Sequence, residues 1–207
     1  MADLNALYGE LTGYIQELGG KFVDKFIPAN PATPPTDYAH DVRAYCVLCH
    51  AAFEDYMETV VLTVTSHAVD QWVTVTPRKI NDVVPALLSW HGAKMKIDDN
   101  ENSIEQKPFD YLRPLILEAK AAFSREVFKN HGVSILYLRN LLIPVAIEIN
   151  SDPNLLNSLK KLAEGRGNYA HKGKVKTVLA PEDAKKHVQD VLTICDDVRV
   201  KALANMI

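Results

Sequence analysis

The segment AYCVLCHAAF, residues 44–53, is apolar on nearly every side when it is wound into a helix. A helix of this kind must be surrounded by protein, because a helix at a surface keeps one polar face. We therefore predict a long helix from about Tyr38 to His67 or beyond, buried in the middle of a helical bundle.

Apolar residues recur at helical spacing along most of the remaining chain, and no segment alternates as a strand would. The pattern predicts further helices over residues 3–26, from Thr76-Pro77 to Trp90, over 108–129, from 135 to a break or kink near Ile143, from a cap at Ser151 or Asp152 into residues 164–173, and from Pro181 onward. PANPATPPT and KIDDNENSIEQK are predicted connectors. The fold class is therefore an all-α bundle in a single domain, with residues 1–30 forming a helix packed on or flanking it.

Composition is that of an ordinary globular chain. Among 207 residues, 47% are apolar and 24% are charged, and the formal net charge is −3. No apolar run approaches the roughly 18 residues that span a membrane. The first residues lack the basic region of a signal peptide, so we expect a cytoplasmic protein without a membrane partner.

Basic residues gather in one short region of this acidic chain. Between residues 160 and 176 there are six lysines and arginines and one acid, Glu164, a local charge of +5 (six minus one). A solvated basic face is one interpretation of this charge. A small site for a polyanion is the other.

Within that region, EGRGNYAHKG at residues 164–173 sets Arg166 five residues before His171. The glycines predict that the helix ends here and unwinds, so that both side chains turn toward one pocket. Histidine exchanges protons near neutral pH, and the arginine fork matches phosphate oxygens. Such a pair suits phosphodiester cleavage in RNA, where the 2′-OH is a built-in nucleophile and no metal is required.

The layout around this pair resembles the HEPN family (higher eukaryotes and prokaryotes nucleotide-binding domain). NLLNSLKKLAEGRGNYAHKG is followed by a short linker and the amphipathic APEDAKKHVQDVLTICDDV. In that family an R-x4-6-H motif likewise follows a helix and precedes a loop and a final amphipathic helix. RAYCVLCHAAFEDYMETVV resembles the apolar helix, with an acidic residue, of its RiboL-PSP-like branch. The resemblance covers roughly residues 38–200 and implies that residues 38–207 form a HEPN-like helical domain.

This resemblance implies a metal-independent endoribonuclease that uses no cofactor. Many HEPN proteins act as toxins or in antiviral defence, and two R-H pairs usually meet in one composite cleft of a homodimer. RNA, a second copy of the chain, and an antitoxin or other defence-system protein are the partners implied.

By the same resemblance, Arg166 binds and polarises the phosphate, and His171 is the general base or acid. The family's polar residue after the arginine is replaced here by Gly167, which leaves Asn168, one position later, as the candidate helper. A tyrosine that one toxin branch carries two residues after the histidine is replaced by Gly173. We expect Lys161, Lys172 and Lys174 to contact RNA.

A further candidate comes from HAAFEDYME, where His50, Glu54 and Glu58 share a helical face. One interpretation is a structural polar stripe. The other is that Glu54 orients Arg166 or His171 in the cleft, and both can hold together.

Two metal-like patterns have simpler explanations. CVLCH at residues 46–50 matches the C-x-x-C-H haem-attachment pattern, and its cysteines with His50 could also suggest zinc. Because the motif lies inside an apolar helix, we interpret Cys46 and Cys49 as core residues and predict neither a metal nor a haem.

Three functions remain open from the sequence. The first is the endoribonuclease, and the second is a catalytically silent HEPN-like module that binds RNA, a nucleotide or a protein. The third is a helical scaffold in which the Arg–His pair only ends a helix.

Overall fold

The computed structural model describes residues 3–30, 33–76, 78, 81–92, 94–95, 107–129, 132–172 and 179–207, and for residues 165–172 it describes the backbone alone. This part of the chain is helical and holds no strand, which confirms the all-α prediction. Its elements are α1 (Leu4–Phe22), η1 (Asp24–Phe26), α2 (Pro35–Thr74), α3 (Val83–His91), α4 (Pro108–Val127), α5 (Ile135–Leu142), η3 (Ile143–Val145), α6 (Pro153–Lys172) and α7 (Pro181–Ala204).

Helix α2 is the centre of the fold. Its 40 residues extend for about 60 Å at the rise of an α-helix. Each of the other six α-helices that the structure describes packs against it. Sixteen of its residues are buried, and they include Cys46, Cys49 and Phe53 of the apolar segment. The prediction of a long helix in the middle of a bundle is confirmed.

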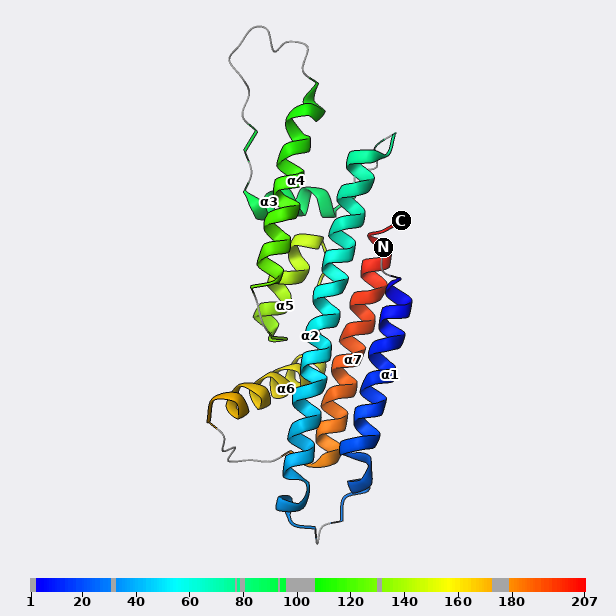
Figure 1. Ribbon diagram of the computed structural model, residues 1–207, viewed down its shortest axis with the longest axis vertical. Coiled ribbons are helices and arrows are strands. Elements are labelled where there is room, and N and C mark those ends of the chain that lie inside the picture. Colours follow the sequence, from blue (N-terminus) through cyan, green and yellow to red (C-terminus); the bar gives the residue numbers. More distant parts are fainter. Residues whose placement is uncertain are drawn as a thin grey trace.

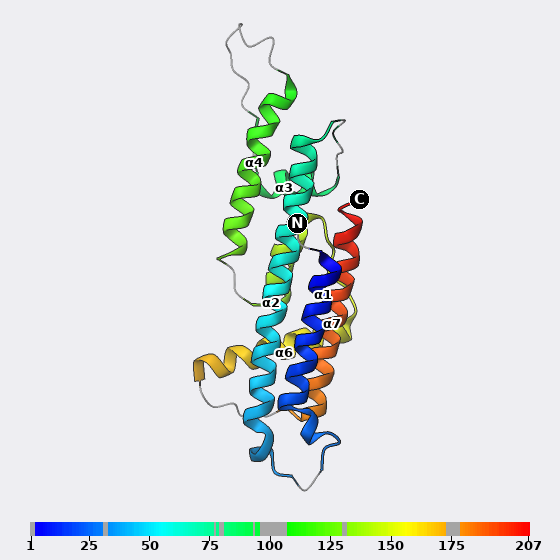
Figure 2. The same cartoon turned by 45° about the vertical axis from the view of Figure 1, so that its right-hand side comes forward.

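Helices α1, α2 and α7 lie side by side along the long axis of the molecule (Figures 1 and 2). The chain runs down α1 and up both α2 and α7, so the two termini lie at the same end. Tyr56 of α2 links the three helices. Its hydroxyl donates to the carbonyl of Cys195 in α7 at 3.2 Å. Its ring also meets Tyr8 of α1 edge-on, with centroids 6.2 Å apart.

Helices α3, α4 and α5 cover a different side of α2. Aromatic contacts hold this part together: Trp90 of α3 meets Phe123 of α4 edge-on at 5.3 Å, and Trp72 of α2 lies 4.9 Å from Phe109 of α4. The short η3 turn follows α5 directly and contains Pro144. The predicted helix end near Ile143 is therefore confirmed.

Helix α6 departs from the common direction. It crosses α2 and α7 steeply, and in both views its C-terminal end projects beyond the bundle (Figures 1 and 2). It packs mainly on α7 and α2. The part of the chain that carries the Arg–His pair therefore lies on a helix that leaves the bundle.

Three helix boundaries differ from the prediction. Helix α1 ends at Phe22 and not at residue 26, and the separate short helix η1 follows it. Helix α3 begins at Val83 and not at Pro77, because the side chain of Asn81 accepts the N–H of Val84 at 3.3 Å and organises the first turn there. Helix α2 begins at Pro35, inside the predicted connector, because proline suits the first position of a helix. Most of the predicted connector at residues 96–107 lies outside the described residues.

No helix within the described residues is both long enough and apolar enough to cross a membrane.

The contact between Tyr56 and α7 predicts a measurable loss of stability. Replacing Tyr56 by Phe removes a buried hydrogen bond and keeps the ring, so we expect the free energy of unfolding to fall by about 1 kcal/mol. Urea denaturation measures this change. Tyr14→Phe is the matched control, because that tyrosine is 44% exposed. Equal stability of the two variants would contradict the proposed role of the Tyr56 hydroxyl.

Candidate functional site

Helix α6 carries the motif, and its start is well defined by the sequence. The carboxylate of Asp152 accepts the N–H of Asn154 at 2.8 Å, and Pro153 is the first helical residue. Of the two predicted caps, Ser151 and Asp152, it is therefore Asp152 that caps this end. Leu159 and Leu162 are fully buried and hold the first half of the helix to the bundle.

The helix does not unwind within the motif. Helix α6 continues through Gly165 and Gly167 and ends at Lys172, so the predicted unwinding between Arg166 and His171 is wrong. Glycine costs about 1 kcal/mol in a helix relative to alanine, but it can adopt helical angles. Positions 166 and 171 therefore lie about 140° apart around the axis and about 7.5 Å apart along it.

Most predicted site residues fall where side chains are not described. The side chains of Arg166, Asn168, His171 and Lys172, and the whole of Lys174, lie outside the described residues, so their roles stay predictions. Lys161 is described and exposed on α6. Its neighbour Lys160 lies 3.9 Å from Glu164, a solvent-exposed pair that contributes little to stability.

A polar cluster joins α6 to α7 just before the motif. Ser158 of α6 is only 2% exposed, and its hydroxyl donates to the carboxylate of Asp190 in α7 at 2.6 Å. The same oxygen lies 2.9 Å from Nδ1 of His187, also in α7. Because an ionised carboxylate only accepts, the single hydroxyl proton of Ser158 is used by Asp190. Nδ1 of His187 therefore carries a proton and donates to Ser158.

Burial lowers the pKa of His187 below its ordinary value. The carboxylates of Asp183 and Asp190 act in the opposite direction, whereas the ammonium groups of Lys186 and Lys161 lower the pKa further. The neutral imidazole is thus favoured at this joint. The sequence analysis did not identify this cluster. The signal for it was Ser158, a polar residue beside the leucine stripe of α6.

Glu54 of α2 binds the segment that precedes α5. Its Oε1 accepts the N–H of Gly132 at 2.6 Å, where the backbone has a φ of 124° that favours glycine. The buried His50 accepts the N–H of Val133 on Nε2 at 3.3 Å, and its Nδ1 lies 3.8 Å from Glu54. These contacts support the structural interpretation of the stripe. The role of Glu54 toward Arg166 or His171 stays a prediction.

The same stripe continues to Glu58, which accepts the hydroxyl of Tyr137 in α5. Burial, followed by this hydrogen bond, raises the pKa of Tyr137 well above its ordinary value. Tyr137 therefore stays protonated and acts as a fixed donor. The polar stripe of α2, formed by His50, Glu54 and Glu58, therefore holds the start of α5 in place.

The cysteines lie in the core. Cys46, Cys49 and Cys195 are free and buried, and burial raises the pKa of the Cys46 thiol to about 12. A thiol with so high a pKa is a weak nucleophile and a weak metal ligand at neutral pH. No group of three histidine, cysteine, aspartate or glutamate side chains in the described part of the chain could hold a metal ion.

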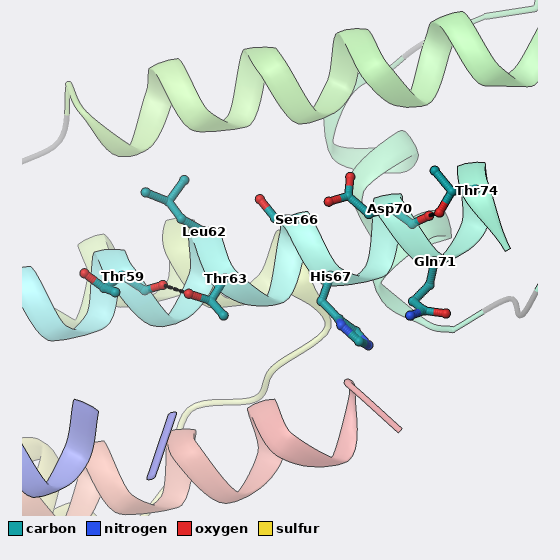
Figure 3. A pocket seen from close by; sticks show the side chains of 8 residues that line it. All are labelled: Thr59, Leu62, Thr63, Ser66, His67, Asp70, Gln71 and Thr74. Atoms are coloured by element: carbon teal, nitrogen blue, oxygen red, sulfur yellow. Dashed lines mark hydrogen bonds between the residues drawn. The ribbon is translucent and has the colours of Figure 1, made fainter. Parts of the chain in front are cut away.

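A groove of about 510 Å³ runs along the C-terminal half of α2, between α4 and α7 (Figure 3). Seven of its eight lining residues are of polar types, and all eight belong to α2: Thr59, Leu62, Thr63, Ser66, His67, Asp70, Gln71 and Thr74. The hydroxyls of Thr63 and Thr74 donate to carbonyls of α2 at 2.8 and 2.6 Å, and Asp70 pairs with Lys120 of α4 at 2.9 Å. No predicted site residue lines this groove, so it is separate from the motif.

A comparison with known families matches residues 15–202 to the sequence profile of the family described as RiboL-PSP-HEPN. The match begins inside α1, earlier than the resemblance suggested, and includes α6 and almost all of α7. No curated protein and no solved structure matches the chain.

The contact between Glu54 and Gly132 predicts a difference between two substitutions. Glu54→Ala leaves a partly buried N–H without its acceptor, so we expect the free energy of unfolding to fall by about 1–3 kcal/mol. Glu54→Gln keeps an acceptor oxygen and should lose much less. Urea denaturation measures both, and Asp55→Ala, at an exposed neighbour, is the control. The expectation fails if Glu54→Ala unfolds at the same urea concentration as Asp55→Ala.

The pKa of His187 predicts how stability depends on pH. Because its pKa is lower in the folded chain, the unfolded chain binds the proton more readily, and stability falls as pH drops through about 6.5. His187→Asn removes this titration and keeps an N–H donor. We therefore expect the decrease in Tm between about pH 7.5 and about pH 5.5 to be smaller in this variant than in wild type. Equal decreases would show that His187 does not contribute.

Proposed function

The chain belongs to the RiboL-PSP-HEPN family, and on that premise we propose that it is a metal-independent endoribonuclease that cleaves RNA through Arg166 and His171. The observation that carries the proposal is the R-x4-H pair on the last turns of α6, where the helix projects beyond the bundle. We further propose that the enzyme acts in the cytoplasm as part of a toxin or antiviral-defence system, alongside an antitoxin or another defence-system protein.

The proposed chemistry uses groups within the RNA and the two motif residues. His171 accepts the proton of a 2′-OH while that oxygen attacks the adjacent phosphorus. The bond to the 5′-oxygen breaks, and this oxygen takes up a proton. The products are a 2′,3′-cyclic phosphate and a 5′-hydroxyl end. Arg166 contacts the phosphate oxygens and stabilises the negative charge that develops on them.

The helical backbone of the motif favours a site shared between two copies of the chain. Positions 166 and 171 lie about 140° apart around one helix, so a single helix presents them in different directions. In a homodimer, Arg166 of one protomer can face His171 of its partner across a two-fold axis. A composite cleft of this kind needs α6 to reach beyond its own bundle.

The remaining predicted residues have supporting roles in this proposal. Asn168 lies between the pair and takes the place of the polar helper that Gly167 does not supply. Lys161, Lys172 and Lys174 contact neighbouring phosphates of the RNA. Glu54 orients Arg166 or His171, in addition to its contact with Gly132.

One observation favours a second function, a non-catalytic module that binds RNA, a nucleotide or a protein. Gly167 removes the family's polar residue next to Arg166, and the backbone there does not unwind to bring the pair together. A basic helix end without catalysis still binds phosphates.

An RNA cleavage assay in EDTA tests the proposal. Total RNA and purified tRNA are incubated with wild type, Arg166→Ala and His171→Ala. We expect wild type to cleave and both variants to lose at least about 100-fold in rate, the scale of a general base. The new 5′-hydroxyl ends are detected by labelling with a polynucleotide kinase.

Arg113→Ala and His40→Ala are the matched controls, since both residues are exposed and lie on other helices, α4 and α2. Glu54→Gln extends the assay: loss of activity without loss of stability would support its orienting role. Cleavage that persists in Arg166→Ala and His171→Ala would refute the assignment of the pair. An inert wild type that binds the same RNA in fluorescence anisotropy would favour the binding module.

A further inference from the structure

The first half of helix α6 packs on the bundle. Among the α6 side chains that the structure describes, Leu162 is the last buried one and Glu164 is exposed, and the backbone continues to Lys172 beyond the bundle. The motif therefore lies on the part of the helix that extends beyond the bundle. Whatever fixes the angle of α6 near its middle also fixes where that end is placed.

Ser158 is the one fully buried polar residue among the described side chains of α6. Its hydroxyl is enclosed by two partners from α7: Asp190 accepts from it at 2.6 Å, and Nδ1 of His187 donates to it at 2.9 Å. The hydrophobic burial of residues such as Leu159 has little directional preference of its own. A hydrogen bond accepts only a narrow range of distance and angle, so this bridge defines one orientation.

We propose that Ser158, His187 and Asp190 are positioning residues that set the angle at which α6 carries Arg166 and His171 to their site. The inference rests on the proposed function for its catalytic consequence. The structural part, one fixed angle between α6 and α7, stands on the bridge alone.

A small change of angle at the bridge matters because the motif lies far from Ser158 along the helix. His171 follows Ser158 by 13 residues, which is about 20 Å along the helix axis. A tilt of about 10° at Ser158 would therefore move the end of the helix by about 3.5 Å. A displacement of about 1 Å at a reacting group can cost about 100-fold in rate. Loss of the bridge should thus reduce turnover far more than it reduces binding of a long RNA.

Two groups of variants test the bridge. Ser158→Ala and His187→Ala remove a member of the bridge. His187→Asn and Asp190→Asn are the conservative variants. In His187→Asn the amide offers an N–H near the position of Nδ1, and in Asp190→Asn the amide oxygen still accepts the serine hydroxyl. Thr65→Val is the matched control for the loss of a buried hydroxyl, since Thr65 donates only to Val61 within its own helix, α2.

The first measurement is steady-state RNA cleavage. We expect kcat to fall about tenfold or more in Ser158→Ala and His187→Ala, with KM changed by less than about threefold. Both conservative variants and Thr65→Val should keep kcat within about threefold of wild type. An equal loss in Thr65→Val and Ser158→Ala would overturn the proposal, because general destabilisation would then explain both.

The second measurement does not depend on activity. Nitroxide labels at Glu164→Cys in α6 and Thr193→Cys in α7 report the distance between the two helices, and the native cysteines are buried and react little. We expect one narrow distance distribution in the wild-type background and a broader or shifted one in Ser158→Ala. An unchanged distribution would overturn the positioning role. An inert wild type with a distribution that broadens in Ser158→Ala would overturn the nuclease alone.

Discussion

The structure depends on the burial of α2. The apolar segment of this 40-residue helix, residues 44–53, has apolar residues on nearly every side and must be surrounded by protein. The six other α-helices of the described chain each cover part of α2. Three polar residues on α2 bind other helices or connecting segments. Tyr56 reaches α7, Glu54 reaches Gly132, and Glu58 reaches Tyr137. The same helix thus supplies the core and places the elements around it.

Helix α6 follows a different rule. Its first half is bound to α2 and α7 by leucines and by the Ser158 bridge, whereas its second half carries Arg166, His171, Lys172 and two glycines. Charged residues are rarely buried in a protein core. A projecting helix end is, however, suited to a site that two protomers share. In the proposed enzyme, one half of the helix meets the requirement for burial and the other half meets the requirement for access to RNA.

The candidate site shows where sequence reasoning succeeds and where it stops. The family, the motif helix, its cap at Asp152 and the burial of the cysteines could all be predicted, because each depends on local spacing or on composition. The Ser158–His187–Asp190 bridge could not be predicted, because His187 and Asp190 follow Ser158 by 29 and 32 residues. They become its neighbours only because α6 crosses α7. For the same reason, the sequence could place Glu54 on one face of a helix but could not predict its contact with Gly132.

The sequence by itself determined an all-α chain with a buried central helix, and it placed the starts of α4, α6 and α7 at prolines that suit the first turn. Only the tertiary structure decided that α3 begins at Val83 and that α6 crosses the bundle. It also decided that the backbone stays helical from Gly165 to Lys172. The reason is physical: caps and apolar spacing act within a few residues, whereas the direction of a helix is set by side chains that meet across the fold.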